Sequence, residues 1–204
     1  MSIKKSTKDR ILEHSLLLFA KSGYKETSVR DIAKEVGIQQ GALYNHFKNK
    51  DAILETLIEE LAESAIVSIF ENKDPQVLAQ RGKSFLSSVA TTFKLISFDK
   101  KNEALYKMMM QEIYKNSKIR DFYHEHFYQK NVKKISSILF YMMQDERIKS
   151  SDPLLLANEF LAPLFFYQNQ VLLLKIDAKS TSSAVMMFEK HVEFFWSIIR
   201  SDGE

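Results

Sequence analysis

Apolar residues recur every three or four positions along most of the chain, and this spacing constrains the fold more than any other feature. The pattern begins with Leu12, Leu16 and Phe19 and stops at Gly23. It places apolar side chains on one face of an α-helix, and a glycine in a left-handed conformation ends many helices. With 5 Gly and 3 Pro in 204 residues, the chain lacks the turn residues that a β-rich fold needs. The sequence therefore predicts an all-α protein.

Residues that begin or end helices separate the predicted elements. Thr27 or Ser28 caps a second short helix, Asp31 is placed for a capping box, and Gly37 ends the helix. Asn49 caps a long fourth helix that continues to about residue 70. Asp-Pro pairs begin two later helices, because Asp caps an N-terminus and Pro fits the first turn. The remaining predicted helices cover residues 75–96, 102–115, 118–144, 153–176 and 181–201.

Composition excludes several classes of site and location. The chain has no cysteine, which excludes disulfides, thiolate metal sites and thiol nucleophiles. The first ten residues are polar and basic, without an apolar signal region. The apolar stretch 154–176 is interrupted by polar residues, so we expect it not to span a bilayer. We expect a soluble, cytoplasmic protein with no membrane partner.

Enzyme motifs are missing from the sequence. It contains no G-x-S-x-G, no glycine-rich phosphate loop and no H-E-x-x-H. His124 and His126 are two positions apart, so on a helix their side chains diverge instead of converging on a metal. His191 lies on an apolar helix and is expected in the core or an interface. We expect no catalytic residue, no metal and no cofactor.

Basic residues gather in the first fifty positions. Residues 1–50 hold ten Lys and Arg against five Asp and Glu, whereas residues 51–204 hold nineteen against twenty-one. Aromatic residues are distributed the other way, with four of 24 in residues 1–50. This asymmetry indicates one part that contacts a polyanion and another that contacts apolar groups, although an ordinary charged surface explains the same numbers. We divide the chain into an N-terminal domain, residues 1–50, and a helical C-terminal domain, residues 51–204.

Residues 27–47 have the pattern of a helix-turn-helix. The first short helix ends at Gly37, and Ile38, Leu43 and Phe47 form the apolar side of the second. In this motif the second helix lies in the major groove of DNA. Short helix pairs around a glycine also occur in other helical proteins, where the polar residues between the apolar anchors form a solvated face.

The polar residues of this segment suit two kinds of DNA contact. Gln can pair with an adenine edge, Ala can touch a thymine methyl, and Gly41 lets the backbone approach DNA closely. Lysine ammonium groups and the hydroxyls of Thr, Ser and Tyr suit phosphates, which position the protein without reading sequence. The candidate DNA-contacting residues are Thr27, Ser28, Gln39, Gln40, Gly41, Ala42, Tyr44, Asn45, His46, Lys48 and Lys50.

An ordered set of short motifs runs from Arg10 to Leu54. It consists of Ile11-Leu12, Leu18-Phe19-Ala20, Gly23-Tyr24, Thr27, Val29-Arg30-Asp31-Ile32-Ala33, Val36-Gly37-Ile38, Gly41-Ala42-Leu43-Tyr44, His46-Phe47 and Lys48-Asn49-Lys50. This combination resembles the TetR/AcrR family of bacterial transcriptional regulators. Where the family commonly has Ser or Thr to cap the recognition helix, this chain has Gln39, a weaker N-cap. The start of that helix and a base contact by Gln39 therefore stay open.

The resemblance implies about nine helices: a three-helix DNA-binding domain, then a helical ligand-binding and dimerisation domain. It also implies a homodimer in which the last two helices of each subunit form the interface and which reads a palindromic operator in double-stranded DNA. The patterning allows this, because helices 153–176 and 181–201 are apolar around more than one face. A large monomeric core is the alternative. The candidate interface residues are Phe165, Leu172, Phe188, Val192, Phe195 and Ile199.

In the family, the helical body holds a pocket for a small inducer. Its many Met and aromatic residues suit a hydrophobic effector, although such residues at helical spacing also fill ordinary cores. The candidate ligand-binding residues are Phe85, Val89, Phe93, Met109, Ile113, Phe122, Tyr123, Phe127, Phe166 and Tyr167.

The sequence thus predicts a homodimeric repressor that a hydrophobic small molecule releases from its operator. Two alternatives remain open. One is an activator or constitutive DNA binder that has no inducer, and the other is a helical lipid or drug carrier with weak DNA affinity.

Overall fold

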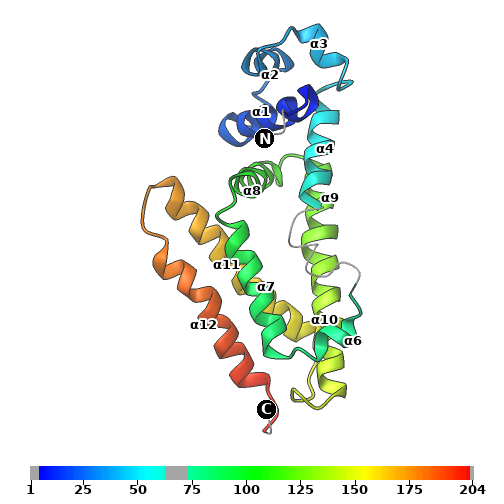
Figure 1. Cartoon of the computed structure of the whole chain (residues 1–204), viewed down its shortest axis with the longest axis vertical. Coiled ribbons are helices and arrows are strands. Elements are labelled where there is room, and N and C mark those ends of the chain that lie inside the picture. The colour runs from blue at the N-terminus through cyan, green and yellow to red at the C-terminus, as the bar shows by residue number, and fades with distance from the viewer. Residues whose placement is uncertain (1–4, 63–72, 203–204) are drawn as a thin grey trace. The chain divides into compact units, whose positions relative to one another are not determined.

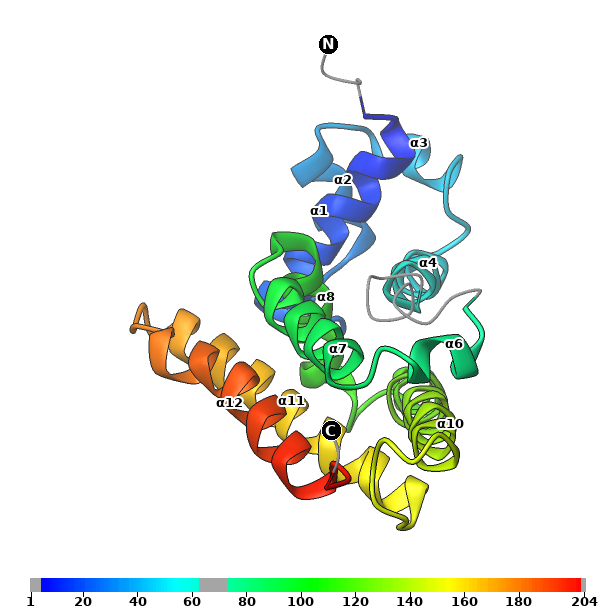
Figure 2. The same ribbon diagram turned by 60° about the horizontal axis from the view of Figure 1, so that its bottom comes forward.

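The computed structural model describes residues 5–62 and 73–202 (Figures 1 and 2). Regular structure in these residues is helical, apart from an isolated antiparallel bridge between Ile148 and Arg200. The predicted all-α fold is confirmed. The chain forms two compact units: the N-terminal unit, residues 1–63 and 100–123, and the C-terminal unit, residues 64–99 and 124–204. The N-terminal unit thus extends beyond residue 50 and includes a segment from much later in the sequence.

Six helices make up the described part of the N-terminal unit. Helix α1 packs against α2, α4 and α8, and α4 also packs against α8. Their shared core contains the fully buried side chains of Ile11, Phe19, Ile32, Leu43 and Ile53. The helices are α1 (Thr7–Ser22), α2 (Val29–Val36), α3 (Gln40–Tyr44), α4 (Lys50–Ala62), α8 (Lys100–Glu112) and α9 (Ser117–Phe122).

Most of the predicted helix ends in this unit are confirmed. Ser28 caps α2 in a reciprocal capping box with Asp31. Gly23 and Gly37 end α1 and α2 with φ of 89° and 74°, in the region that glycine adopts at little cost. The side chain of Asn49 accepts a hydrogen bond from a first-turn amide of α4. The predicted continuation of this helix to about residue 70 lies outside the described residues.

The C-terminal unit is built around two long helices, α11 and α12, which lie side by side (Figures 1 and 2). Helix α7 packs against both, and α10 packs against α11 and α6. Phe85, Phe93, Phe160 and Phe188 are fully buried between these helices. The helices are α6 (Pro75–Ala79), α7 (Lys83–Ile96), a π-helix (Tyr123–Lys130), α10 (Asn131–Gln144), α11 (Pro153–Ile176) and α12 (Ser182–Ile199).

Two predicted helices are interrupted. The helix expected over residues 75–96 breaks at Gly82, whose φ is 49° and where an added β-carbon would lie 3.4 Å from the Trp196 ring. The helix expected over 118–144 is instead α9, the π-helix and α10 in succession. Both breaks depend on local backbone conformations that the periodicity of apolar residues does not encode.

Gln168 is an exception in the apolar core of the C-terminal unit. Its side chain is 3% exposed, and its Oε1 has no hydrogen-bond partner among the described residues. A buried carbonyl oxygen without a partner costs about 1–3 kcal/mol of stability. The presence of Gln168 at this position of α11 is therefore not explained by the stability of the chain alone.

We predict that Gln168→Leu raises the free energy of unfolding by about 1 kcal/mol, because leucine has a similar size and leaves no polar atom unpaired. Chemical denaturation measures the change. Gln144→Leu, at an exposed position at the end of α10, is the control and should change stability by less than about 0.5 kcal/mol. A clear loss of stability in Gln168→Leu would mean that the amide is paired in the folded protein.

Candidate nucleic-acid interface

Helices α2 and α3 form the predicted helix-turn-helix. The Asp31 carboxylate accepts the Ser28 N–H at 2.9 Å, and the Ser28 hydroxyl oxygen accepts the Asp31 N–H at 3.1 Å, which fixes the start of α2. Gly37 turns the chain in a left-handed conformation and donates its N–H to carbonyls of the last turn of α2. Leu43 and Phe47 are buried and anchor α3 and the residues after it in the core. The opposite face of α3 is left free.

That free face is polar and carries most of the candidate residues. Tyr44 is 47% exposed, and the Gln40 amide donates a 3.4 Å hydrogen bond to the Tyr44 hydroxyl one turn away. A β-carbon added at Gly41 would meet no atom within 4 Å, so the chain itself does not require glycine there. The candidate residues exposed on this side of the motif are Ser28, Gln39, Gln40, Gly41, Tyr44, Asn45, His46 and Lys48, and Ala42 is half-buried.

Gln39 is the N-cap of α3, as its position in the family pattern implies. Its side chain makes no capping hydrogen bond, and the residue is exposed. The weak-cap interpretation is confirmed, and the amide of Gln39 is left available for another partner.

Thr27 and Lys50, two of the predicted phosphate contacts, are engaged within the N-terminal unit. Thr27 is 3% exposed, and its hydroxyl donates to the Gly23 carbonyl at 2.9 Å. The Lys50 ammonium donates to the carbonyls of Tyr24 and Thr27, each at 2.8 Å. These groups stabilise the turn between α1 and α2, and their contact with phosphate stays a prediction.

Tyr24 lies at the centre of these contacts, a role that its residue type did not predict. The Lys50 ammonium lies 4.3 Å from the centroid of its ring, and its hydroxyl donates a short hydrogen bond to the Asp51 carboxylate. Burial and the Asp51 carboxylate raise the pKa of the Tyr24 phenol. The phenol therefore stays protonated and keeps donating this bond at neutral pH. The Gly23-Tyr24 pair of the family motif was the signal that could have identified it.

Helices α8 and α9 belong to the same unit, although they lie far along the chain. Lys101 of α8 pairs with Glu60 of α4 at 2.8 Å, and Lys118 of α9 pairs with Glu55 of α4. The Glu112 carboxylate of α8 accepts the Tyr24 N–H at 3.0 Å. Helix α4 and the turn between α1 and α2 are thus attached to a segment of the predicted ligand-binding domain.

The candidate ligand-binding residues are divided between the two units. Phe85, Val89 and Phe93 are fully buried in the C-terminal unit, and Met109 is buried in the N-terminal unit. Phe166 is 64% exposed, so it does not line an enclosed pocket of the single chain. The half-buried candidates are Ile113, Phe122, Tyr123 and Tyr167, and the side chain of Phe127 lies outside the described residues.

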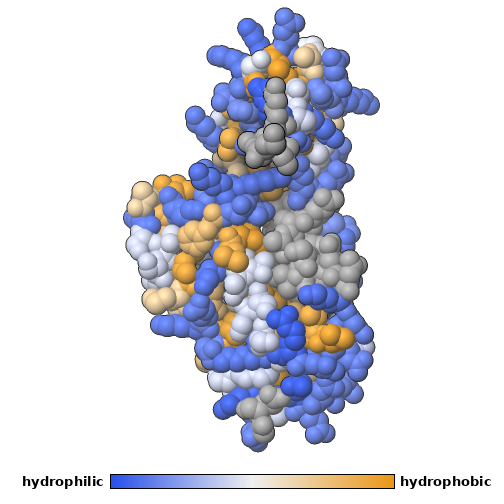
Figure 3. Space-filling model, in the orientation of Figure 1, coloured by the Kyte–Doolittle hydropathy of each residue, from blue (hydrophilic) through white to orange (hydrophobic). Residues whose placement is uncertain are grey.

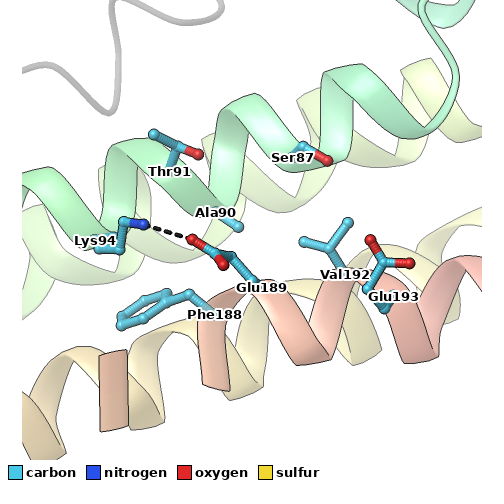
Figure 4. Close-up of a pocket in the computed structure, with 8 residues that line it drawn as sticks. All are labelled: Ser87, Ala90, Thr91, Lys94, Phe188, Glu189, Val192 and Glu193. Atoms are coloured by element: carbon cyan, nitrogen blue, oxygen red, sulfur yellow. Dashed lines mark hydrogen bonds and ion pairs between the residues drawn. The ribbon is translucent and has the colours of Figure 1, made fainter. Parts of the chain in front are cut away.

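A shallow hollow lies between α7 and α12 in the C-terminal unit (Figure 4). Its volume is about 60 Å³, and the ion pair of Lys94 with Glu189, 2.6 Å long, crosses one end of it. Pockets for drug-sized ligands have volumes of roughly 300–1,000 Å³. This hollow is too small for such a ligand, and the predicted effector pocket stays a prediction.

Most of the candidate interface residues are buried within the single chain, Phe165 is half-buried, and their part in a dimer interface stays a prediction. Leu172, Phe188, Val192, Phe195 and Ile199 are each at most 8% exposed in the single chain, so this stripe faces the chain's own core. Apolar periodicity finds a stripe on a helix but does not say which of two adjacent stripes faces inward. The exposed apolar residues of α11 and α12 are Leu154, Leu155, Phe166, Leu173, Ile176, Met186, Met187, Phe194 and Ile198. Apolar patches over these helices are visible in Figure 3.

The core location predicted for His191 is confirmed. His191 is 8% exposed, stacks on Phe160 and hydrogen-bonds its carbonyl at 2.9 Å, which makes it a core residue. His124 and His126 bond instead to their own helix neighbours Gln129 and Lys130. The described residues contain no cluster of three or more potential metal ligands. No helix among them has the length and hydropathy needed to cross a membrane.

The N-terminal unit is a helix-turn-helix domain of the kind that places a short helix in DNA. Residues 11–57 match the family model described as "Bacterial regulatory proteins, tetR family". Residues 11–57 therefore form a DNA-binding segment of the TetR-family type.

Curated relatives match mainly in this segment. YerO of Bacillus subtilis, an uncharacterized HTH-type transcriptional regulator, is 51% identical over 47 residues, which are 23% of this chain and 16% of that protein. IcaR of Staphylococcus epidermidis, a negative transcriptional regulator of the icaADBC biofilm operon, is 34% identical over 67 residues, 33% of this chain and 36% of that protein. The match thus spans about a third or less of these relatives.

Solved structures match over nearly the whole chain and show the fold. The regulator FadR from Bacillus subtilis, in complex with stearoyl-CoA, is 22% identical, with a TM-score of 0.68 over 93% of this chain and 97% of that chain. The SmeT–triclosan complex is 16% identical, with a TM-score of 0.71 over 98% of this chain and 94% of that chain.

We predict that Lys48→Ala weakens DNA binding without changing stability, whereas Lys50→Ala lowers stability. Lys48 is exposed, so its replacement should leave thermal unfolding unchanged. If it contacts a phosphate, the slope of log affinity against log salt concentration should become less steep by about 1. Lys50→Ala removes a cation from two carbonyls and should destabilise the protein by about 1–3 kcal/mol. Equal thermal stability of the two variants would show that the Lys50 contacts contribute nothing to the fold.

Proposed function

We propose that this protein is a homodimeric transcriptional repressor that acts in the cytoplasm on a palindromic operator. The observation that carries the proposal is the exposed face of α3. It presents Gln40, Tyr44 and Asn45 outward from a helix whose opposite side is buried. Uncharged hydrogen-bonding side chains on a short helix suit base edges, and the nearby Lys48 suits a phosphate.

The proposal that it represses is supported by IcaR, the similar protein that is a negative regulator. Repression by occupancy requires only that the protein cover the operator. An activator would need in addition a surface that contacts polymerase, and no observation here favours one.

A second copy of the chain is the partner that best fits the exposed apolar residues of α11 and α12. Phe166 and Phe194 are 64% and 66% exposed, which is unusual for phenylalanine on the surface of a monomer. A two-fold dimer buries the same patch of both subunits and pairs two α3 helices with the two half-sites of a palindrome.

A hydrophobic small molecule is the effector that best fits the C-terminal unit. Its core is rich in phenylalanine, and the structurally similar FadR and SmeT are recorded with stearoyl-CoA and triclosan. The Oε1 of Gln168, which has no hydrogen-bond partner within residues 5–62 and 73–202, would accept a hydrogen bond from a donor on such a ligand. Reversing a 99:1 preference for the operator-binding state requires about 5.5 kcal/mol of differential effector binding.

Selection of bound DNA from a random pool tests this function. We expect an inverted repeat whose half-sites lie about one helical turn apart, bound with an affinity that falls steeply with salt. Enrichment of single half-sites would refute the dimer. Failure to enrich any sequence, together with tight binding of apolar ligands, would support a lipid or drug carrier instead.

We predict that Gly41→Ala stabilises the protein yet weakens operator binding. An alanine here meets no atom of the chain and favours the helix by up to about 1 kcal/mol. If the backbone of α3 approaches DNA closely, the added methyl group occupies that space. Thermal unfolding and a binding titration on the same sample measure both effects. Unchanged operator affinity in the stabilised variant would show that DNA does not come close to position 41.

We predict that Phe194→Lys converts the dimer to a monomer, because it places two charges in an apolar contact. The control is Phe140→Lys, at a 45% exposed position of α10, which should leave the mass in solution unchanged. Analytical ultracentrifugation measures both variants. A dimer that survives the Phe194 substitution would contradict the proposed interface.

A further inference from the structure

We propose that Glu112, at the end of α8, is a positioning residue for DNA binding, an inference that rests on the proposed function. Its carboxylate holds the turn between α1 and α2, and through that turn it sets the position of the helix-turn-helix. Glu112 lies outside the matched family segment, residues 11–57.

The contact is local, buried and made between residues far apart in sequence. Glu112 is 3% exposed, and its Oε1 accepts the backbone N–H of Tyr24 at 3.0 Å across a sequence separation of 88 residues. A hydrogen bond from an amide to a buried carboxylate is stronger than one between neutral groups. The bond therefore fixes the Tyr24 backbone to the last turn of α8.

Gly23 lies next to this carboxylate. Its φ of 89° turns the chain at the end of α1, a conformation that other residues adopt only with strain. A β-carbon at this position would lie 3.4 Å from the Oε1 of Glu112, at the limit of ordinary van der Waals contact. The turn therefore requires the glycine, and it brings the Tyr24 N–H to the carboxylate.

Tyr24 connects Glu112 to the residues on either side of the helix-turn-helix. Its carbonyl accepts a hydrogen bond from Lys50, and the same ammonium binds the carbonyl of Thr27, next to the Ser28 cap of α2. Its hydroxyl donates to Asp51 of α4. The start of α4 is therefore bonded directly to the residue that Glu112 holds, and Thr27, just before α2, is joined to it through Lys50.

The path of the chain gives this contact a regulatory consequence. Helix α8 follows α7 of the C-terminal unit after three residues, and the chain re-enters that unit after Tyr123. A shift of α8 that lengthens the Glu112–Tyr24 contact would release the α1–α2 turn. The helix-turn-helix would then have to be ordered again when DNA binds, which lowers affinity.

Glu112→Ala and Glu112→Gln test the role. Alanine removes the acceptor, whereas glutamine keeps an oxygen that can accept the Tyr24 N–H. We expect Glu112→Ala to bind the selected operator about tenfold more weakly, which corresponds to the loss of one charge-assisted hydrogen bond, and Glu112→Gln to restore most of the affinity. Glu59→Ala, at an exposed position of α4, is the control for the change in net charge.

A second measurement reports on the contact without DNA. In amide NMR spectra, the Tyr24 N–H should lose its protection from hydrogen exchange in Glu112→Ala and keep it in Glu112→Gln. If the wild-type protein enriches no DNA sequence, the proposed function fails, whatever the exchange data show. If the wild type binds its operator and Glu112→Ala binds equally well, or if glutamine restores nothing, the positioning role is overturned.

Discussion

The five residues of α3 are too few to form a stable helix alone, and the candidate interface depends on how the chain compensates for this. Nucleating a helix costs more than one turn of hydrogen bonds returns. Burial of Leu43 and Phe47 and the left-handed turn at Gly37 hold α3 in place instead. Because the buried face of α3 holds the helix in place, the residues of its exposed face need not stabilise the fold. They can instead be polar residues that suit contact with DNA.

Much of this unit could be predicted because its signals are local. Ser28 with Asp31, Gly37 and Asn49 each act on a helix end within a few residues, so the pattern of residue types is sufficient. The roles of Thr27 and Lys50 depend on contacts with residues more than twenty positions away or on burial. Their residue types, a hydroxyl and a cation near a DNA-reading motif, equally suit a phosphate.

In the C-terminal unit, the positions of most helices along the chain could be predicted, but the face that each helix buries could not. On α12, Val192 faces the core and Phe194 faces outward, although both lie on apolar stripes. Only the positions of the neighbouring helices decide which stripe is covered. The break at Gly82 and the π-helix have the same origin, since each depends on backbone geometry imposed by packing. Helix α8 joins the N-terminal unit by packing against α1 and α4, which the sequence does not reveal, and its buried Glu112 has a residue type that alone suggests a solvated surface.

The central claim is that two α3 helices are held one turn of DNA apart, and a distance between them tests it most directly. Because the chain has no cysteine, Glu35→Cys, at an exposed position of α2 to which we assign no DNA contact, gives one labelling site per subunit. On the selected operator, spin labels at this site should show one narrow distance that fits two α3 helices about 34–36 Å apart, one helical turn of DNA. Absence of dipolar coupling, or a broad distribution that the operator does not narrow, would contradict the account.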